Sequence, residues 1–247
     1  MAQSSQMDEP PGNPGRFIRF TSKVPAATVL PGLFFSKLVG VGQIEPLPAA
    51  QLPEQMRALD PQLAFAPLSR IGWKEQFAIL VGERSLVVGC RMPYPGWVAF
   101  KPAILEVLGV LKEAQIVTRV HRHSLKYIDL LNTGDDDAEA LRRLNVSVRV
   151  GSHTIASENT ALRSELKRGP FLQAVQVASR AVVQQEGVGT RTGALIDVDT
   201  LAIAELEPAE FFANLPSSLE DLHTANKQMF FECLTEYGLS LLEPKYD

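Results

Sequence analysis

The segment from Trp97 to Asn132 constrains the fold of this chain more than any other part of its sequence. From Trp97 to Ala114, apolar residues recur at spacings of three and four, the pattern of a helix that buries one face. After a short break, the stretch from Gln115 to Leu131 has the character of a long strand. Because a helix with one apolar face must bury it against another element, we predict a helix that lies on a sheet.

The rest of the sequence predicts two hairpins and a second long helix. The strand-like runs 70–81 and 85–91 flank a turn that contains glycine, and so do the runs 172–183 and 191–204. The motif Ser217-Ser218-Leu219-Glu220 has the form of a capping box, which predicts the start of an amphipathic helix. Each half of the chain therefore follows the same order, a hairpin and then a long helix.

The expected fold class is α+β, with a mostly antiparallel sheet and two long amphipathic helices packed against it. The repeated order of elements raises the question whether the two halves are similar and share one sheet. The expected boundaries are a disordered tail over residues 1–15, a first α+β half over 16–134 and a second over 135–247. Shorter elements are expected as strands at 17–24, 30–41 and 145–150 and as helices at 52–59 and 138–144, with the second long helix ending near Gly238.

Composition narrows the classes of function. The 247 residues include 24 basic and 28 acidic ones, and the net charge of −4 gives no general attraction to nucleic acid or to an anionic membrane. The two cysteines, Cys90 and Cys233, cannot form a disulfide scaffold, which suits a reducing compartment. The sequence shows no secretory signal and no apolar run long enough to span a bilayer. We therefore expect a cytoplasmic protein without membrane association.

The strand that follows the central helix carries the main candidate site. Arg119, His121, His123 and Tyr127 are spaced by even numbers of residues, so strand alternation predicts that they share one face. Arginine and tyrosine are residues that anchor protein interfaces. This face is therefore predicted to be a partner-binding surface, and the alternative is an ordinary solvated face of a strand.

Two other interpretations of the same strand stay open. Arg119, Arg122, Lys126 and Tyr127 combine cations with an aromatic ring, which is how proteins hold single-stranded nucleic acid. His121 and His123 could also ligate a metal, but a site needs further ligands, and no spacing singles out His153, His223 or a carboxylate. We predict neither a metal nor a cofactor.

Catalytic motifs are not apparent. Ser152, His153 and Ser157 lie close in sequence, but no orienting acid or nucleophile elbow accompanies them. The aspartate run 135–137 lacks the alternating ligands of a calcium loop and is typical of a turn before a helix. We predict no catalytic residue, which favours a non-enzymatic protein.

Four segments of the sequence carry a family resemblance: IGWKEQF, PGWVAF, SLKYIDLLN and LEDLHTANKQMFFECLTEYGLSLLEP. The chain resembles a sporadically distributed family of uncharacterised bacterial and archaeal proteins of similar length. The resemblance implies no activity, and a patchy distribution is typical of mobile or defence-associated genes. Asp129 stands where the family usually has asparagine. The matching residues are Lys126, Tyr127, Ile128, Leu222, His223, Phe230 or Phe231, and Thr235.

The leading prediction is a non-enzymatic protein-binding protein within a bacterial defence or toxin-regulating system. The alternative is a nucleic-acid-binding module that uses the basic strand 119–127, and a metal-dependent enzyme built on His121 and His123 ranks third. A protein partner is expected, and the chain is expected to form a homo-oligomer.

Overall fold

The computed structural model describes residues 15–61, 63–133, 136–185 and 189–242. The predicted disordered tail lies outside these residues, except for Gly15, which already belongs to the first strand.

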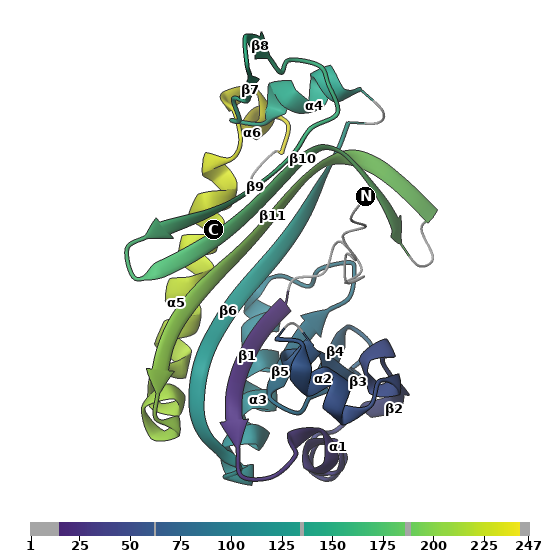
Figure 1. Cartoon of the computed structure of the whole chain (residues 1–247), viewed down its shortest axis with the longest axis vertical. Helices are drawn as coiled ribbons and strands as arrows, with labels where there is room; N and C mark the ends of the chain where they lie inside the picture. The colour runs from purple at the N-terminus through teal and green to yellow at the C-terminus, as the bar shows by residue number, and fades with distance from the viewer. Residues whose placement is uncertain (1–14, 62, 134–135, 186–188, 243–247) are drawn as a thin grey trace.

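One antiparallel sheet dominates the described residues (Figure 1). Its nine strands lie in the order β2-β3-β4-β5-β1-β6-β11-β10-β9. The central strand β6 pairs with β1 on one side and with β11 on the other, so one continuous sheet spans both halves of the chain. The α+β class and the antiparallel sheet are thus confirmed. The bounds are β1 Gly15–Ser22, β2 Val41–Pro46, β3 Pro67–Trp73, β4 Phe77–Gly82, β5 Ser85–Cys90, β6 Val117–Asn132, β9 Ala161–Arg168, β10 Phe171–Gln185 and β11 Gly189–Leu206.

Three helices pack against one face of the sheet: α1 (Ala26–Lys37), α3 (Trp97–Ala114) and α5 (Pro208–Glu232). We call this side the helix face and the opposite side the open face. In Figure 1, α3 and α5 lie behind the strands. The expectation of two long helices is not confirmed, because α1 is a third helix in the same layer. Among the described residues, the helices are all too short or too polar to span a bilayer.

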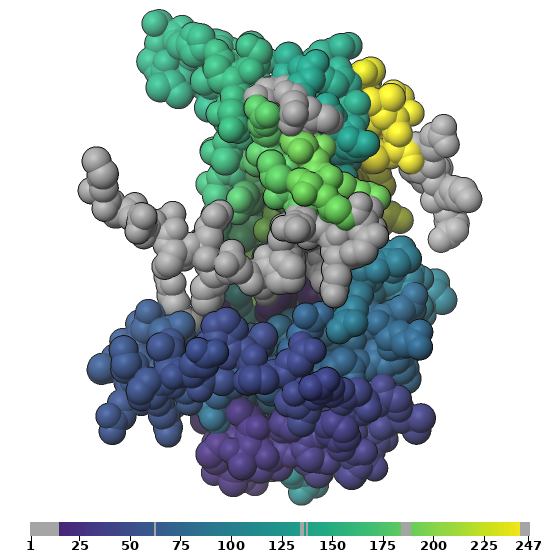
Figure 2. All heavy atoms as spheres, turned by 90° about the vertical axis from the view of Figure 1, so that its right-hand side faces the viewer, coloured from purple at the N-terminus to yellow at the C-terminus, as the bar shows by residue number. Residues whose placement is uncertain are grey.

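The remaining elements are short. In Figure 2 the first half of the chain fills the lower part of the molecule, in purple and blue, and the segment from α4 to β8 lies at the top. The short elements are α2 (Glu54–Leu59), α4 (Asp137–Arg143), α6 (Glu236–Ser240), β7 (Arg149–Val150), β8 (His153–Thr154) and turns of 3-10 helix at Pro48–Gln51 and Leu63–Phe65.

The helix α3 has the predicted bounds, and its apolar residues recur at the spacing of one buried helical face. Phe100, Ile104 and Leu108 have 0% exposure and lie on one side of the helix, against the sheet and α5. The helix starts after Gly96, whose φ of 86° favours glycine, and stops at Gln115 in the left-handed region.

Several predicted elements are wrong. The run 30–41 was expected to be a strand, but it belongs mainly to α1, because its apolar residues Leu30 and Phe34 are buried four residues apart on one helical face. The run 70–81 is two strands, separated by a turn at Lys74 and Glu75, which both have positive φ. β9 was not predicted.

The second long helix also differs from its prediction at both ends. It starts at Pro208, since proline is well suited to a first helical turn, and the expected capping-box residue Ser217 lies inside it, bonded to the Asn214 carbonyl. It ends at Glu232, before the predicted stop at Gly238. Of the predicted strand 145–150, only Arg149 and Val150 are in a strand.

Candidate functional site

An irregularity in β6 decides where the predicted site residues lie. Phe20 of β1 pairs with Val120, but Arg19 pairs with Arg122, so His121 is an extra residue in β6. Such a bulge reverses the alternation of side chains beyond it. The expectation that Arg119, His121, His123 and Tyr127 share one face is therefore wrong. Arg119 and His121 lie on the open face, whereas His123 and Tyr127 lie on the helix face.

Arg119 and His121 are partly exposed and bind carboxylates at the end of β11. The Arg119 guanidinium donates to Glu207, and the side chains are 43% and 61% exposed. His121 Nδ1 lies 2.8 Å from the Glu205 carboxylate, and its Nε2 lies 2.6 Å from the Thr21 hydroxyl. Both side chains thus have carboxylate partners that are exposed to solvent.

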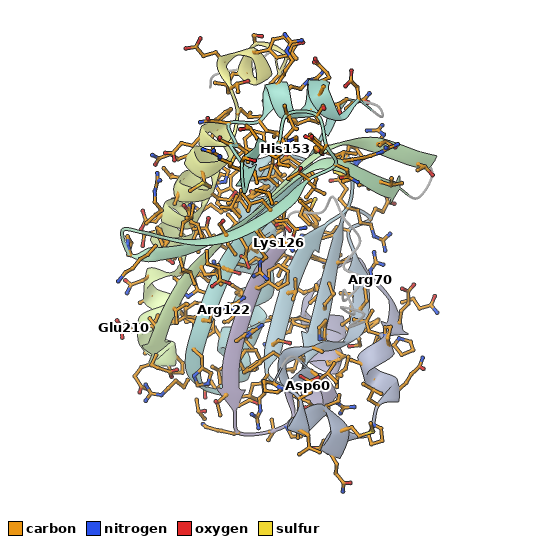
Figure 3. The ribbon with its side chains drawn as sticks, turned by 45° about the horizontal axis from the view of Figure 1, so that its top comes forward. Asp60, Arg70, Arg122, Lys126, His153 and Glu210 are labelled. Carbon is orange, nitrogen blue, oxygen red and sulfur yellow. The ribbon has the colours of Figure 1, made fainter. Side chains whose placement is uncertain are left out.

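The same arrangement continues along the open face between β6 and β11. Lys126 Nζ lies 3.3 Å from Asp197, and Arg122 Nη2 lies 3.8 Å from Asp199. Arg122 and Lys126 lie along β6 over the middle of the sheet (Figure 3). In every pair β6 supplies the cation. The anion comes from β11 in three pairs, and in the fourth it is Glu207, which follows β11 directly and precedes α5. We call these pairs, which comprise Arg119–Glu207, His121–Glu205, Arg122–Asp199 and Lys126–Asp197, the ion-pair ladder.

The ladder changes the chemistry of the basic strand. A cation that already faces a carboxylate gains little from a phosphate, since binding the phosphate would leave the carboxylate unpaired. Arg119, Arg122 and Lys126, the cations of the nucleic-acid alternative, all have such partners. The ladder thus presents a row of cations beside a row of carboxylates, and each cation faces a carboxylate.

On the helix face, His123 belongs to a buried polar cluster. It is 5% exposed, its Nε2 lies 2.9 Å from the Ser218 hydroxyl of α5, and its ring packs edge-on against Phe211 at 5.2 Å. Burial, together with the positive charge of Arg16, lowers the pKa of His123 to about 3. The imidazole is therefore neutral at physiological pH, and it cannot form part of an accessible surface.

Arg16 is the least expected member of this cluster. Its exposure is 0%, and none of its three guanidinium nitrogens has a hydrogen-bond partner among the described residues. Burial lowers the pKa of Arg16 to about 9, although the Asp199 carboxylate opposes the shift. A buried cation without acceptors destabilises the folded state.

Replacement of Arg16 by methionine is therefore expected to raise the free energy of unfolding by about 1–2 kcal/mol. Methionine fills a similar volume and needs no hydrogen bonds. Chemical denaturation of the purified protein measures the change. Arg19→Met is the matched control, because Arg19 lies on the same strand but on the open face, where its guanidinium stacks on Phe65. A loss of stability in Arg16→Met would show that the guanidinium finds acceptors in solution.

Tyr127 lies in an aromatic group between the sheet and α5. Its hydroxyl is 2.9 Å from that of Tyr94 and 3.4 Å from His223 Nδ1. The His223 ring stacks on Trp97 at 4.2 Å, and the Trp97 indole donates to Glu220 over 3.1 Å. Burial raises the pKa of both tyrosines, that of Tyr94 to about 12. The phenols thus stay protonated, the opposite of what a catalytic phenolate requires.

Asn226 connects α5 to the two central strands, and the sequence interpretation missed it. Its side-chain amide donates to the backbone carbonyls of Leu125 in β6 and Val198 in β11, over 3.0 and 2.8 Å. It also lies 3.2 Å from the Thr200 hydroxyl. A single asparagine in a helical pattern gives no sequence signal for this role. These contacts fix the position of α5 over the sheet behind the ladder.

The other candidates do not converge on a site. In the described part of the chain, no group of three or more His, Cys, Asp and Glu side chains could hold a metal ion. His153 of the β7–β8 hairpin, which lies at the top of the molecule in Figure 1, pairs with Glu158 at 2.7 Å. Glu158 also accepts backbone hydrogen bonds from Ala156 and Ser157, so it braces its own loop.

Comparison of the sequence with protein-family models and with curated proteins finds no match. The resemblance to the sporadically distributed family therefore stays a prediction.

Proposed function

We propose that this chain is a non-catalytic binding protein that recognises a protein partner through the exposed end of the ion-pair ladder. The observation that carries the proposal is Ile203, which is 60% exposed on β11 next to the two outermost ion pairs. We call this surface the ladder end; it comprises Arg119, His121, Ile203, Glu205 and Glu207.

The composition of the ladder end resembles that of a protein interface. Interfaces combine an apolar centre with a polar rim, and arginine is enriched in them. Here an exposed isoleucine lies beside an arginine and a histidine that carboxylates already hold in place. Little side-chain entropy remains to be lost when such a surface binds.

A neighbouring hollow extends this surface around the end of the sheet. It has a volume of about 320 Å³, and its lining combines the apolar residues Leu111, Pro208 and Phe212 with the polar residues Lys23, Lys112 and Gln115. Pro208 directly follows Glu207 of the ladder end, so the hollow and the ladder end adjoin. A partner that places an apolar side chain in the hollow could contact Arg119 and Glu207 with polar groups.

The expected partner is a protein because the ladder end carries both charges and an apolar residue. Nucleic acid would require cations in excess of carboxylates, and the net charge of the chain is −4. The bacterial defence or toxin-regulating setting stays a prediction, which the identity of the partner would test.

Substitution of Ile203 by aspartate is expected to weaken partner binding at least tenfold, or about 1.4 kcal/mol, because a charge replaces the apolar centre of the interface. A photo-crosslinking amino acid at position 203 identifies the partner in the native host, and calorimetry with the purified partner gives the affinity. Val182→Asp is the matched control, since Val182 is also β-branched and 66% exposed but lies toward the other end of the β10–β11 hairpin.

Equal affinities of the Ile203→Asp and Val182→Asp variants, with unchanged melting temperatures, would contradict the proposal. A labelled single-stranded oligonucleotide tests the alternative. Binding that falls steeply with salt and is lost in Arg119→Ala would assign the surface to nucleic acid instead.

A further inference from the structure

The strand β9 forms one edge of the sheet and is exposed along its length. It pairs with β10 from Ala161 to Arg168 without a shift in register, and no other strand of the described residues pairs with its outer side. Its residues are exposed except for Ser164, which is half-buried. In Figure 1 this edge lies at the left of the sheet. Such an edge offers unpaired backbone N–H and C=O groups to another strand.

The two faces of β9 have different chemistry. Leu162, Ser164 and Leu166 point to the helix face, where they line a hollow of about 220 Å³ beside the end of α5. The leucines are 38% and 40% exposed. Arg163 and Glu165 alternate with them on the open face, and their side chains form an exposed ion pair of 3.2 Å. The edge therefore carries one apolar row and one charged row.

We propose that β9 pairs with β9 of a second copy of this chain, antiparallel, about a two-fold axis at Ser164. In an antiparallel pair, side chains directly opposite one another share a face. Around this axis Leu162 faces the partner's Leu166 and Arg163 faces the partner's Glu165. By symmetry each contact occurs twice, which is the property of an isologous interface.

Neighbouring registers do not match apolar residues with apolar ones and cations with anions. Side chains that oppose one another lie on the same face of the sheet, so even-numbered residues pair with even-numbered ones. A two-fold axis must therefore pass at a residue of β9 and not between two residues. An axis at Arg163 would place this cation opposite its own copy, and each leucine would lose its apolar partner. An axis at Glu165 would oppose two carboxylates and would also place Arg163 opposite Lys167. Like charges directly opposite are destabilising, which disfavours both registers. An axis at Leu166 would place Glu165 opposite Lys167, but Leu162 would then face Pro170, beyond the end of β9. The axis at Ser164 pairs both leucines and both charged residues within the strand, so we favour it.

The resulting dimer would have one sheet that continues across both copies, with both α5 helices on the same side. The hollows beside the two α5 helices would meet at the axis, so the exposed leucines of β9 would pack on each other. The ladder end lies on β6, on β11 and at Glu207 directly after β11, outside this contact. The dimer would therefore present two ladder ends, and the inference does not depend on what they bind.

Sedimentation velocity of the full chain tests the dimer, and charge reversal tests its register. The wild type is expected to be a dimer, and Glu165→Arg is expected to raise the dissociation constant at least tenfold because cations then face cations. The double exchange Arg163→Glu/Glu165→Arg restores opposite charges and should restore the dimer. Lys167→Glu is the matched control, because Lys167 faces only Ala161 in this register.

Cysteine cross-linking provides an independent test of the axis. Ser164 is the residue that faces its own copy, and opposite Cα atoms in an antiparallel pair lie about 4.5–5.5 Å apart, within the range of a disulfide. Oxidation should therefore cross-link Ser164→Cys but not Glu165→Cys. Cys233 lines the same hollow as Ser164, so both variants are made in a Cys233→Ala background, whereas the buried Cys90 is kept.

A monomeric wild type would overturn the proposal. A dimer whose dissociation constant is unchanged by Glu165→Arg, or one that cross-links through Glu165→Cys, would overturn it as well. If Glu165→Arg fails to fold, as shown by its circular dichroism spectrum, the double exchange and the Ser164→Cys cross-link still decide the question.

Discussion

Truncation of Leu108 to alanine is expected to lower the free energy of unfolding by about 2–5 kcal/mol. The side chain lies in the middle of α3 with 0% exposure, inside the core cluster that α1, α3, α5 and the sheet share. Alanine would leave a cavity there, and the surrounding helices and strands cannot all move to fill it. Guanidinium denaturation of the wild type and the variant measures the difference.

Val98→Ala is the matched control on the same helix. Val98 is 87% exposed, so its truncation should change stability by no more than about 0.5 kcal/mol. If Leu108→Ala were as stable as Val98→Ala, α3 would not be packed on the sheet. Phe230 of α5 is less suited to this test, because it is only half-buried at the edge of the second core cluster.

The spacing of apolar residues predicted the long elements of this fold, because in a long element the spacing repeats many times. Helix α3 buries one side over its whole length, and the β10–β11 hairpin alternates over long arms. The apolar run in α1 is short, and over such a length helical and extended spacings are difficult to separate. Strand β9 has only Leu162 and Leu166 as large apolar residues, so no clear strand pattern is visible in its sequence.

The candidate site was harder to predict because its geometry depends on pairing between distant segments. The bulge at His121 exists only relative to β1, and one extra residue was enough to move His123 and Tyr127 to the other face. Asp197 and Asp199 interrupt the apolar pattern of β11 in the sequence, because they face the cations Lys126 and Arg122 of β6. Arg16 gave no sequence sign of burial, because an arginine in a strand is usually exposed.

Acidification is expected to destabilise this protein through His123. The pKa of this imidazole is about 3 in the folded protein, because of burial first and of the positive charge of Arg16 second, against an ordinary value of 6.5. Between these two values the unfolded chain binds a proton that the folded chain does not. Stability from this residue is thus complete above pH 6.5 and is lost as the pH falls towards 3. Integration over the titrations of His123 in the folded and unfolded states gives a loss of about 3 kcal/mol in the free energy of unfolding by pH 4.5.

The effect can be isolated by comparison with His123→Gln, which keeps a polar partner for the Ser218 hydroxyl. Asp129 acts in the opposite direction, since burial and Asp197 raise its pKa to about 6, and acid then relieves a buried charge. Both proteins contain Asp129, so its contribution cancels in their difference. Denaturant unfolding from pH 7.5 to pH 4.5 should show that the wild type loses about 3 kcal/mol relative to His123→Gln.

His121→Gln, which removes the exposed histidine of the same strand, controls for the substitution itself. Parallel stability curves for the wild type and His123→Gln would mean that His123 takes up its proton in the folded state. The bulge would then not hold the imidazole against Phe211 and Ser218, and His123 would return to the accessible surface that strand alternation predicted for it.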